Sequence, residues 1–359
     1  MSSNILVTGA AGYVGGSIVA DFLSSNIQAL KSSRVIATVR SDEQAKLLSK
    51  SGINVLQLDL TDEKARTIMR ADGIVVNIVI HTASSLDPRL AFNLLTGLAE
   101  QQKASGSKAY FIHTSGLSAF LPKTGWPEGE MKDSDSIFET EKQFAESFAL
   151  RKNDVDITEA AKALGIASFI VVPCTVYGKG TGQWNQLSVI FPITVQASIK
   201  QKSVSKFPED GKSAGVHISD LTNLYGLIVK NILEGSAALI PNGIRGYYVA
   251  IAHEMSRWET LGRLAAAMKA RGLVASSETK VWTSDEAAAE ATGVPTMFVD
   301  IFFNSSANII ADNAFKLGWK PKWDETCFLD NIDDEIMSVL ELGKAKSSLI
   351  DSLFLAAGS

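Results

Sequence analysis

Short apolar runs alternate along the first half of the chain with segments whose apolar positions have helical spacing. The runs predict six strands, at residues 5–7, 34–39, 55–58, 73–81, 109–113 and 167–173. The main helices are expected at residues 14–23, 90–105 and 154–164. Strands that are apolar at nearly every position and alternate with helices are typical of a parallel sheet covered on both faces. We therefore predict an α/β fold with a Rossmann-type, doubly wound parallel sheet.

The pattern becomes less regular from about residue 181. The stretch 181–208 carries the aromatic residues Trp184, Phe191 and Phe207, and a helix-rich tail starts near Ser256. We predict that residues 1–180 form the sheet domain, with a return to it around 212–235. Residues 181–359 would mainly form a small C-terminal substrate lobe. In doubly wound folds the ligand lies beyond the carboxyl ends of the strands, so the substrate is expected between the sheet and this lobe.

Three glycines at intervals of three residues follow the first predicted strand. Gly9 permits a tight turn, Gly12 lets the backbone approach a pyrophosphate, and Gly15 allows close packing of the next helix on the strand. The unpaired N–H groups at the start of that helix can bind the phosphates. A strand before the glycines and a helix after them are the context that a dinucleotide site requires. We therefore predict that residues 1–180 are an NAD(P)-binding domain.

The residue after the second strand predicts which dinucleotide is bound. An NAD site usually has Asp or Glu there, to accept a hydrogen bond from the ribose 2′-hydroxyl. This chain has Arg40, whose guanidinium can pair with a 2′-phosphate. NADP(H) is therefore expected rather than NAD(H).

Several motifs follow one another in the order of a known family. They are Thr8-Gly9-x-x-Gly12-x-x-Gly15, Leu58-Asp59-Leu60, Ile80-His81-Thr82-Ala83, Ile112-His113-Thr114-Ser115, Pro173-Cys174-Thr175-Val176-Tyr177-Gly178, Val216-His217-Ile218-Ser219-Asp220-Leu221 and Leu317-Gly318-Trp319-Lys320-Pro321. With them the chain resembles the extended or atypical short-chain dehydrogenases/reductases, in the epimerase/dehydratase and dihydroflavonol-reductase-like group. The resemblance covers nearly the whole chain.

The resemblance implies the positions of the cofactor and of one catalytic hydroxyl. The implied cofactor-binding residues are Thr8, Gly9, Gly12, Tyr13, Val14, Arg40, Asp59, Leu60, Thr82, Ala83, Thr114, Pro173 and Val176. Ser115 matches the serine that holds the substrate oxygen. Asp59 would accept a hydrogen bond from the adenine amino group, although it also fits a helix cap before Thr61.

The other two catalytic groups of the family are not in their usual pattern. Members use a tyrosine that passes a proton and a lysine four residues later, on the same helical face. None of the six tyrosines of this chain has a lysine four residues later. In one register Phe138 replaces the tyrosine and Lys142 keeps the lysine position. In a second register the two positions fall near Glu146 and Leu150, with Arg151 as a basic substitute.

Two other side chains are alternative proton donors in the sequence. Tyr177 lies on the loop that faces the site in related proteins, and His113 shares a strand face with Ser115. An aromatic residue at 177 is also a structural feature of the family, and a lone histidine on an apolar strand is more often a core residue. We take Ser115, Lys142 and Tyr177 as the candidate catalytic residues.

Composition excludes several classes of function. The net charge of −5 argues against nonspecific nucleic-acid binding. The two cysteines have neither metal-ligand nor disulfide spacing, and no cluster of His, Cys and carboxylates predicts a metal. No apolar run reaches a membrane-spanning length and no secretory signal is recognised. We expect a cytoplasmic protein with a small-molecule substrate and neither nucleic-acid nor membrane partners; a homodimer is left open.

The leading prediction is an NADP-dependent oxidoreductase that acts on a carbonyl or alcohol of a small hydrophobic substrate. Two alternatives remain because the tyrosine is missing. One is a redox-neutral enzyme of the same fold, such as an isomerase, dehydratase or cyclase. The other is a non-catalytic regulatory protein that senses NADP.

Overall fold

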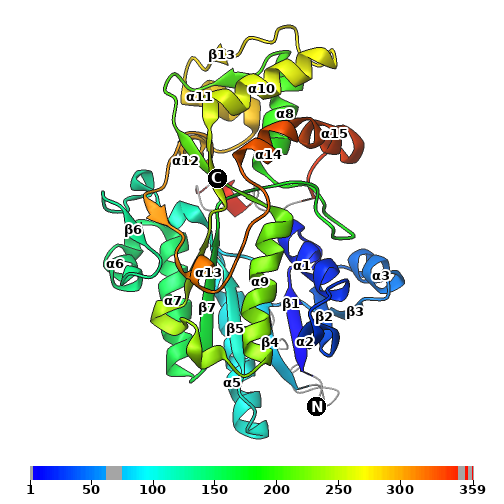
Figure 1. Ribbon diagram of the computed structural model, residues 1–359, viewed down its shortest axis with the longest axis vertical. Coiled ribbons are helices and arrows are strands. Elements are labelled where there is room, and N and C mark those ends of the chain that lie inside the picture. The colour runs from blue at the N-terminus through cyan, green and yellow to red at the C-terminus, as the bar shows by residue number, and fades with distance from the viewer. Residues whose placement is uncertain (1–2, 62–74, 347–351, 355–357, 359) are drawn as a thin grey trace.

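A seven-stranded parallel sheet is the centre of the computed structural model, which describes residues 3–61, 75–346, 352–354 and 358 (Figure 1). The strand order within these residues is β11-β7-β5-β4-β1-β2-β3. The chain reverses its direction of strand addition between β1 and β4, which is the place where doubly wound folds bind their ligands. This arrangement confirms the predicted Rossmann-type fold class.

The strands form one central sheet and several smaller ones. The central sheet contains β1 (Asn4–Thr8), β2 (Arg34–Val39), β3 (Asn54–Gln57), β4 (Val76–His81), β5 (Tyr110–Thr114), β7 (Ala167–Pro173) and β11 (Tyr247–Ala250). Smaller sheets are formed by β6 (Met131–Lys132), β8 (Thr175–Tyr177), β9 (Ser205–Lys206), β10 (Lys212–His217), β12 (His253–Ser256), β13 (Lys280–Val281) and β14 (Ile309–Ile310).

The helices fall into two groups. Those of the sheet domain are α1 (Tyr13–Leu23), α2 (Gln28–Lys31), α3 (Asp42–Lys50), α5 (Pro88–Ser105), α6 (Ile137–Gln143), α7 (Ala149–Ala163), α9 (Ile218–Leu233) and α13 (Asn313–Lys316). Those of the upper lobe in Figure 1 are α8 (Ile190–Gln201), α10 (Arg257–Ala270), α11 (Asp285–Thr292), α12 (Thr296–Phe303), α14 (Glu325–Asp330) and α15 (Ile332–Leu342).

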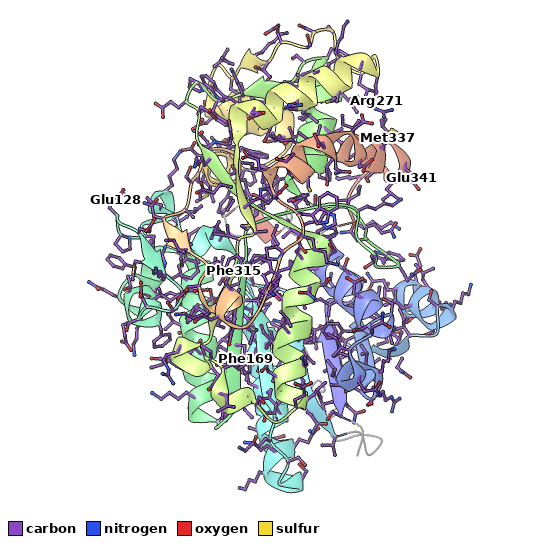
Figure 2. All side chains as sticks on the ribbon, in the orientation of Figure 1. Glu128, Phe169, Arg271, Phe315, Met337 and Glu341 are labelled. Carbon is purple, nitrogen blue, oxygen red and sulfur yellow. The ribbon has the colours of Figure 1, made fainter. Side chains whose placement is uncertain are left out.

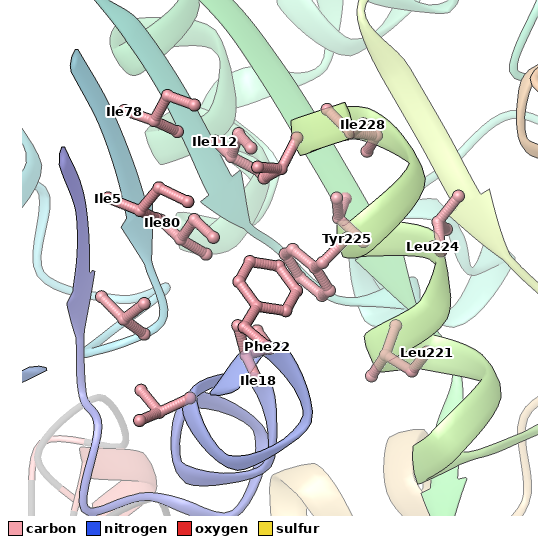
Figure 3. Close-up of a cluster of buried hydrophobic side chains, with 14 of the residues drawn as sticks. Ile5, Ile18, Phe22, Ile78, Ile80, Ile112, Leu221, Leu224, Tyr225 and Ile228 are labelled. Carbon is pink, nitrogen blue, oxygen red and sulfur yellow. The ribbon is translucent and has the colours of Figure 1, made fainter. Parts of the chain in front are cut away.

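Helices cover the sheet on both faces because successive residues of each strand point to opposite sides. Ile5 of β1 packs with α1 and α9, whereas its neighbour Leu6 packs with α5 and α7. Figure 3 shows the first of these layers, where Ile80 and Ile112 face Phe22 of α1. The same layer is closed by four labelled residues of α9: Leu221, Leu224, Tyr225 and Ile228.

Most predicted strands agree with the structure to within one residue at each end. Residues 73 and 74 of the strand predicted at 73–81 lie outside the described part of the chain. Within the described residues this strand, β4, begins at Val76. The helix predicted to start at Asp154 begins at Ala149. Strand β11 was not predicted, and it extends the sheet by pairing Tyr247 with Ile170 of β7.

The upper lobe is a layer of helices placed beyond the carboxyl ends of the strands (Figure 1). Its helices α10 and α15 are joined by Arg271, labelled in Figure 2, which donates to the Asp333 carboxylate. Residues 212–235, expected to return to the sheet domain, form β10 and α9, and α9 packs on the sheet. In the described part of the chain, no helix combines the length and the apolar character needed to cross a bilayer.

Candidate functional site

The carboxyl edge of the sheet brings together most of the residues proposed for the cofactor. Strand β1 ends at Thr8, β4 is followed by Thr82 and Ala83, and β5 ends at Thr114. The side chains at this edge are linked, since Thr82 Oγ1 donates to the carbonyl of Thr8 over 2.6 Å. Thr114 Oγ1 lies 2.6 Å from the hydroxyl of Tyr225 on α9. The carboxyl edge of the sheet is therefore a closely packed surface of hydroxyl and backbone groups.

The glycines of the first turn are required by close backbone contacts. Gly9 has φ +67°, and a Cβ on it would lie 2.7 Å from the carbonyl oxygen of Thr82. A Cβ on Gly15 would lie 2.4 Å from both Thr82 Oγ1 and the Gly9 carbonyl oxygen. A Cβ on Gly12 would meet only the Gly9 oxygen, at 3.0 Å. Gly9 and Gly15 thus hold the turn against β4, while Gly12 leaves an open approach to the N-terminus of α1, as a pyrophosphate requires.

A loop that follows β8 crosses the first two turns of α1. The Tyr13 hydroxyl donates to the Gly178 carbonyl over 2.7 Å, and the Thr181 backbone N–H donates to Ser17 Oγ over 3.2 Å. The N–H of Gly178 is bound in turn by the buried Glu335 carboxyl of α15. Tyr13, Gly178 and Glu335 therefore connect the start of α1, directly after the glycine turn, with the upper lobe.

Arg40 and Asp59 lie where the outer strands β2 and β3 end. The side chain of Arg40 is exposed, as the prediction of a 2′-phosphate partner requires. Asp59 accepts hydrogen bonds from the hydroxyl and the N–H of Thr61, and these two bonds lower its pKa, with a smaller contribution from Arg40. The helix that Asp59 would cap lies outside the described residues, so both the cap and the role of Asp59 toward adenine stay predictions.

Ser115, directly after β5, is bonded to a buried carboxylate. Its Oγ donates to Oδ2 of Asp154, and Asp154 has no exposed surface. His113 Nε2 lies 3.4 Å from the other carboxylate oxygen. Because Ser115 is 6% exposed while Asp154 is fully covered, the serine is the member of this pair that a substrate can touch.

A second carboxyl group lies behind Asp154. Glu141 of α6 contacts Asp154 and accepts a hydrogen bond from the Tyr247 hydroxyl of β11. Burial is the main cause that raises the pKa of Glu141 well above its usual value, and the charge of Asp154 raises it further. Two carboxyl groups in one apolar site cannot both be ionised at low cost. Burial and the charge of Asp154 therefore both favour the protonated form of Glu141.

The two other candidate catalytic residues have different partners. The Lys142 amine pairs with Glu159 of α7 at 2.5 Å, and half of its side chain is exposed. Tyr177 is buried, and its hydroxyl lies 2.8 Å from His253 Nε2 in the upper part of the molecule. Burial raises the pKa of Tyr177 far above its usual value. The structure therefore brings neither Lys142 nor Tyr177 to Ser115.

The structure also shows where the two proposed registers of the catalytic helix lie. Phe138 is buried in α6, and Glu146 is in the 3-10 turn Ala145–Ser147, where it pairs with the exposed Lys152. Arg151 is fully buried and donates to the carbonyls of Ala119 and Phe144. None of these side chains takes the place of the missing tyrosine.

Asp154 and Glu141 were not among the candidate residues. A signal for Asp154 was present, because it lies three and four residues before Ile157 and Thr158, on the buried face of α7. An acid on an apolar helical face is costly unless it has a partner. Its partners come from β5 and α6, and one sequence does not reveal such long-range contacts.

A cavity of about 90 Å³ opens in the upper lobe, and most of its exposed surface is apolar, although polar side chains also line it. Residues 190–207 contribute Phe191 and Phe207, and the facing helices contribute Leu261 and Phe302. Thr175 of β8 also lines it, only two residues after the end of β7. The lining contains hydroxyl groups and one charged residue, Arg257, so it suits an apolar ligand with few polar groups. No group of His, Cys, Asp and Glu able to hold a metal ion occurs in the described residues.

Comparisons with known proteins bear on the family and the fold of the chain. The model of the NAD dependent epimerase/dehydratase family matches residues 5–238. The uncharacterised protein C2A9.02 of Schizosaccharomyces pombe is 24% identical over 322 residues, which cover 88% of this chain and 94% of that protein.

Solved structures with the same fold include enzymes of different activities. UDP-glucose 4-epimerase of Thermotoga maritima superposes with a TM-score of 0.61 at 15% identity, covering 94% of this chain and 99% of its own. Vestitone reductase of alfalfa superposes with a TM-score of 0.61 at 17% identity, covering 95% and 99%. At these identities the likeness establishes the fold alone.

Proposed function

The chain belongs to the NAD dependent epimerase/dehydratase family, and from this premise we propose that it is an NADP-dependent oxidoreductase acting on a carbonyl or alcohol of a small hydrophobic substrate. The observation that carries the proposal is the position of Ser115. Its hydroxyl lies at the same sheet edge as the glycine turn, and a buried carboxylate holds it.

The residues present fit a dinucleotide with a phosphorylated ribose. Gly12 leaves room at the N-terminus of α1 for the pyrophosphate, and the exposed Arg40 supplies a cation at the end of β2. When bound, the dinucleotide supplies or takes the hydride. Thr82, Ala83 and Pro173 would bound the nicotinamide end, since they follow or end the central strands β4 and β7.

The residues of the chain then handle the substrate oxygen and its proton. Ser115 would hold the oxygen by a hydrogen bond and exchange a proton with it. The apolar cavity near Thr175 would receive the rest of the molecule and exclude water from it. This arrangement favours a carbonyl or secondary alcohol attached to an apolar or aromatic body.

A direct experiment measures both cofactor and reaction. NADPH and NADH binding is titrated by fluorescence, and NADPH consumption is followed with a panel of apolar aldehydes and ketones. Turnover with NADPH supports the proposal. No turnover across the panel, with NADPH bound, would contradict it and favour a sensor.

The family supports one alternative, a redox-neutral reaction such as an epimerisation or dehydration. In that case the dinucleotide would be recycled within each turnover. Cofactor that copurifies with the protein, together with turnover that needs none added, would favour this alternative.

A further inference from the structure

The polar cluster behind Ser115 is unusual because it lies inside an apolar layer. Asp154, Glu141, His113 and Tyr247 have no exposed surface. The side chains around them include Ile137, Phe138, Val155 and Val249, all of one hydrophobic cluster. Burying ionisable groups in such surroundings costs free energy. A cluster of this kind is a candidate for a functional role.

The cluster forms one continuous path of contacts. The Tyr247 hydroxyl donates to Glu141, Glu141 contacts Asp154, and Asp154 accepts from the hydroxyl of Ser115. The members come from β11, α6, α7 and the end of β5, so the whole fold is needed to assemble them. Ser115 alone has any exposed surface. The path therefore leads from the core to the sheet edge where the cofactor and the substrate are expected.

The charges around the path allow one proton between the two carboxyl groups. Two adjacent buried carboxyl groups share a proton rather than ionise together. The charge of Arg151 in α7 lowers the pKa of Glu141 and so opposes the effect of burial. The guanidinium of Arg151, however, donates its hydrogen bonds to backbone carbonyls. On the other side, His113 stacks on His81 at 5.3 Å, and burial lowers the pKa of His81 to about 3, so His81 adds no charge.

We propose that Asp154 and Glu141 hold one shared proton behind Ser115, and that Asp154 exchanges this proton with the serine hydroxyl during the reaction. The inference rests on the proposed function for its catalytic half. The shared proton itself rests on the complete burial of the two carboxyl groups and on their hydrogen bonds with Ser115 and Tyr247. Ser115 is then the catalytic residue, and Asp154 and Glu141 are positioning residues that act through it.

The proton transfer balances without an added group. In the direction of reduction, the Ser115 O–H bond breaks and its proton forms an O–H bond with the substrate oxygen, which receives negative charge as the carbon takes the hydride. Before this step the shared proton moves from Glu141 to Asp154 Oδ2, and the serine hydroxyl turns from Asp154 to the substrate oxygen. The Asp154 Oδ2–H bond then breaks as the serine gives up its proton, and the Asp154 proton restores the serine hydroxyl. A proton from solvent returns to the carboxyl pair before the next turnover. The electron pair of each broken bond stays on its oxygen. In oxidation both protons move the opposite way, and the carboxyl pair regains the proton.

This relay would supply what the missing tyrosine supplies in the family. A phenol next to a lysine is one way to place a proton at the substrate oxygen. A serine backed by a carboxyl pair that retains a proton near neutral pH is another.

The shared proton is tested by infrared spectroscopy of the whole protein near neutral pH. We expect the C=O band of a protonated carboxyl group to be present in the wild type and lost in Glu141→Gln. Ser115→Ala should shift this band, because it removes the hydrogen bond to Asp154. The matched control is Glu335, another buried glutamate: Glu335→Gln removes a different band, and Ser115→Ala leaves that one in place.

Absence of a band difference in Glu141→Gln would overturn the shared proton. So would a band that does not respond to Ser115→Ala. If Glu141→Gln does not fold, Tyr247→Phe tests the same contact, since it removes the donor to Glu141 and should shift the band.

Kinetics test the catalytic half with any carbonyl compound that the panel identifies. Asp154→Asn should lower kcat by about 100-fold or more and leave the Kd of NADPH unchanged. Glu141→Gln should move the pH dependence of kcat, which a merely structural role would not do. Full kcat in Asp154→Asn would overturn the relay. No turnover in the wild type would contradict the proposed function instead, while the band decides the shared proton.

Discussion

Gly15 of α1 lies so close to Thr82 that a Cβ on it would come within 2.4 Å of Thr82 Oγ1. Real side chains do not tolerate this separation, so any other residue would push the helix away from the end of β4. The contact joins the N-terminal part of α1, where we propose that the phosphates bind, to the strand end that would bound the nicotinamide. The spacing of the glycines is thus a requirement of packing as well as of phosphate binding.

We predict that Gly15→Ala weakens NADPH binding at least tenfold and lowers the unfolding temperature, because the turn must move. Calorimetric titration and thermal unfolding measure the two effects. The control is Gly262→Ala in α10, where a Cβ would meet nothing within 4 Å. There alanine should stabilise the helix by about 0.5–1 kcal/mol. If both variants had the same Kd for NADPH and the same unfolding temperature, the close contact between Gly15 and Thr82 would not be required for binding or for stability.

We predict that Arg40→Ala raises the Kd of NADPH about tenfold and leaves the Kd of NADH within about twofold. A charge-assisted hydrogen bond to a phosphate contributes about 1.5–3 kcal/mol, and exposure of Arg40 reduces this. Arg34→Ala is the matched control, because Arg34 is an exposed arginine at the opposite end of the same strand. An equal loss for both dinucleotides in Arg40→Ala would contradict a 2′-phosphate site.

We predict that Arg151→Met destabilises the protein by about 3–5 kcal/mol in urea unfolding. The buried guanidinium donates to the carbonyls of Ala119 and Phe144 and to Ser147 Oγ, and methionine would leave these acceptors without a partner. Arg271→Met removes an arginine from the half-exposed pair with Asp333 and should cost far less, because water screens such a pair. Similar losses in both variants would contradict the structural role of Arg151.

We predict a pH dependence of stability from Glu335. Burial raises the pKa of this carboxyl to about 7 in the folded protein, whereas in the unfolded chain it ionises near 4.5. Its contribution to stability is therefore full below about pH 4.5 and is lost as the pH rises through about 7. The loss should amount to about 3 kcal/mol.

Glu335→Gln keeps an oxygen that can accept from the Gly178 N–H but removes this ionisation. The variant should gain unfolding temperature relative to the wild type at pH 8 and not at pH 5. A temperature difference that is the same at both pH values would refute the assignment.

The sheet could be predicted because its information is local. Apolar runs such as residues 34–39 have strand length and β-branched residues, and the glycine turn marks the point where β1 ends and a helix begins. Strand β11 was missed because its four residues lie far in sequence from the other strands of the central sheet, beyond the point where the apolar pattern becomes less regular. Only the tertiary pairing with β7 identifies it.

The site divides in the same way. Gly9, Gly12 and Ser115 come directly after strands and could be placed by counting from them. Lys142 could not be placed, because its predicted role depends on whether α6 or α7 faces Ser115, and this is a matter of helix packing. Asp154 could not be found either, because its hydrogen bond with Ser115 joins α7 to the end of β5 and depends on the same packing.

The late position of β11 affects how the protein folds as it is synthesised. The edge of β7 that pairs with Tyr247–Ala250 has no partner until that segment has left the ribosome, after the lobe's first helix α8 and the sheet-covering α9 have emerged. Domains generally fold from the N-terminus as the chain emerges, and unpaired strand edges aggregate. A chain stopped near residue 180 would therefore present an open strand to other nascent chains, and translation of the next seventy or so residues is the interval in which a chaperone would be needed.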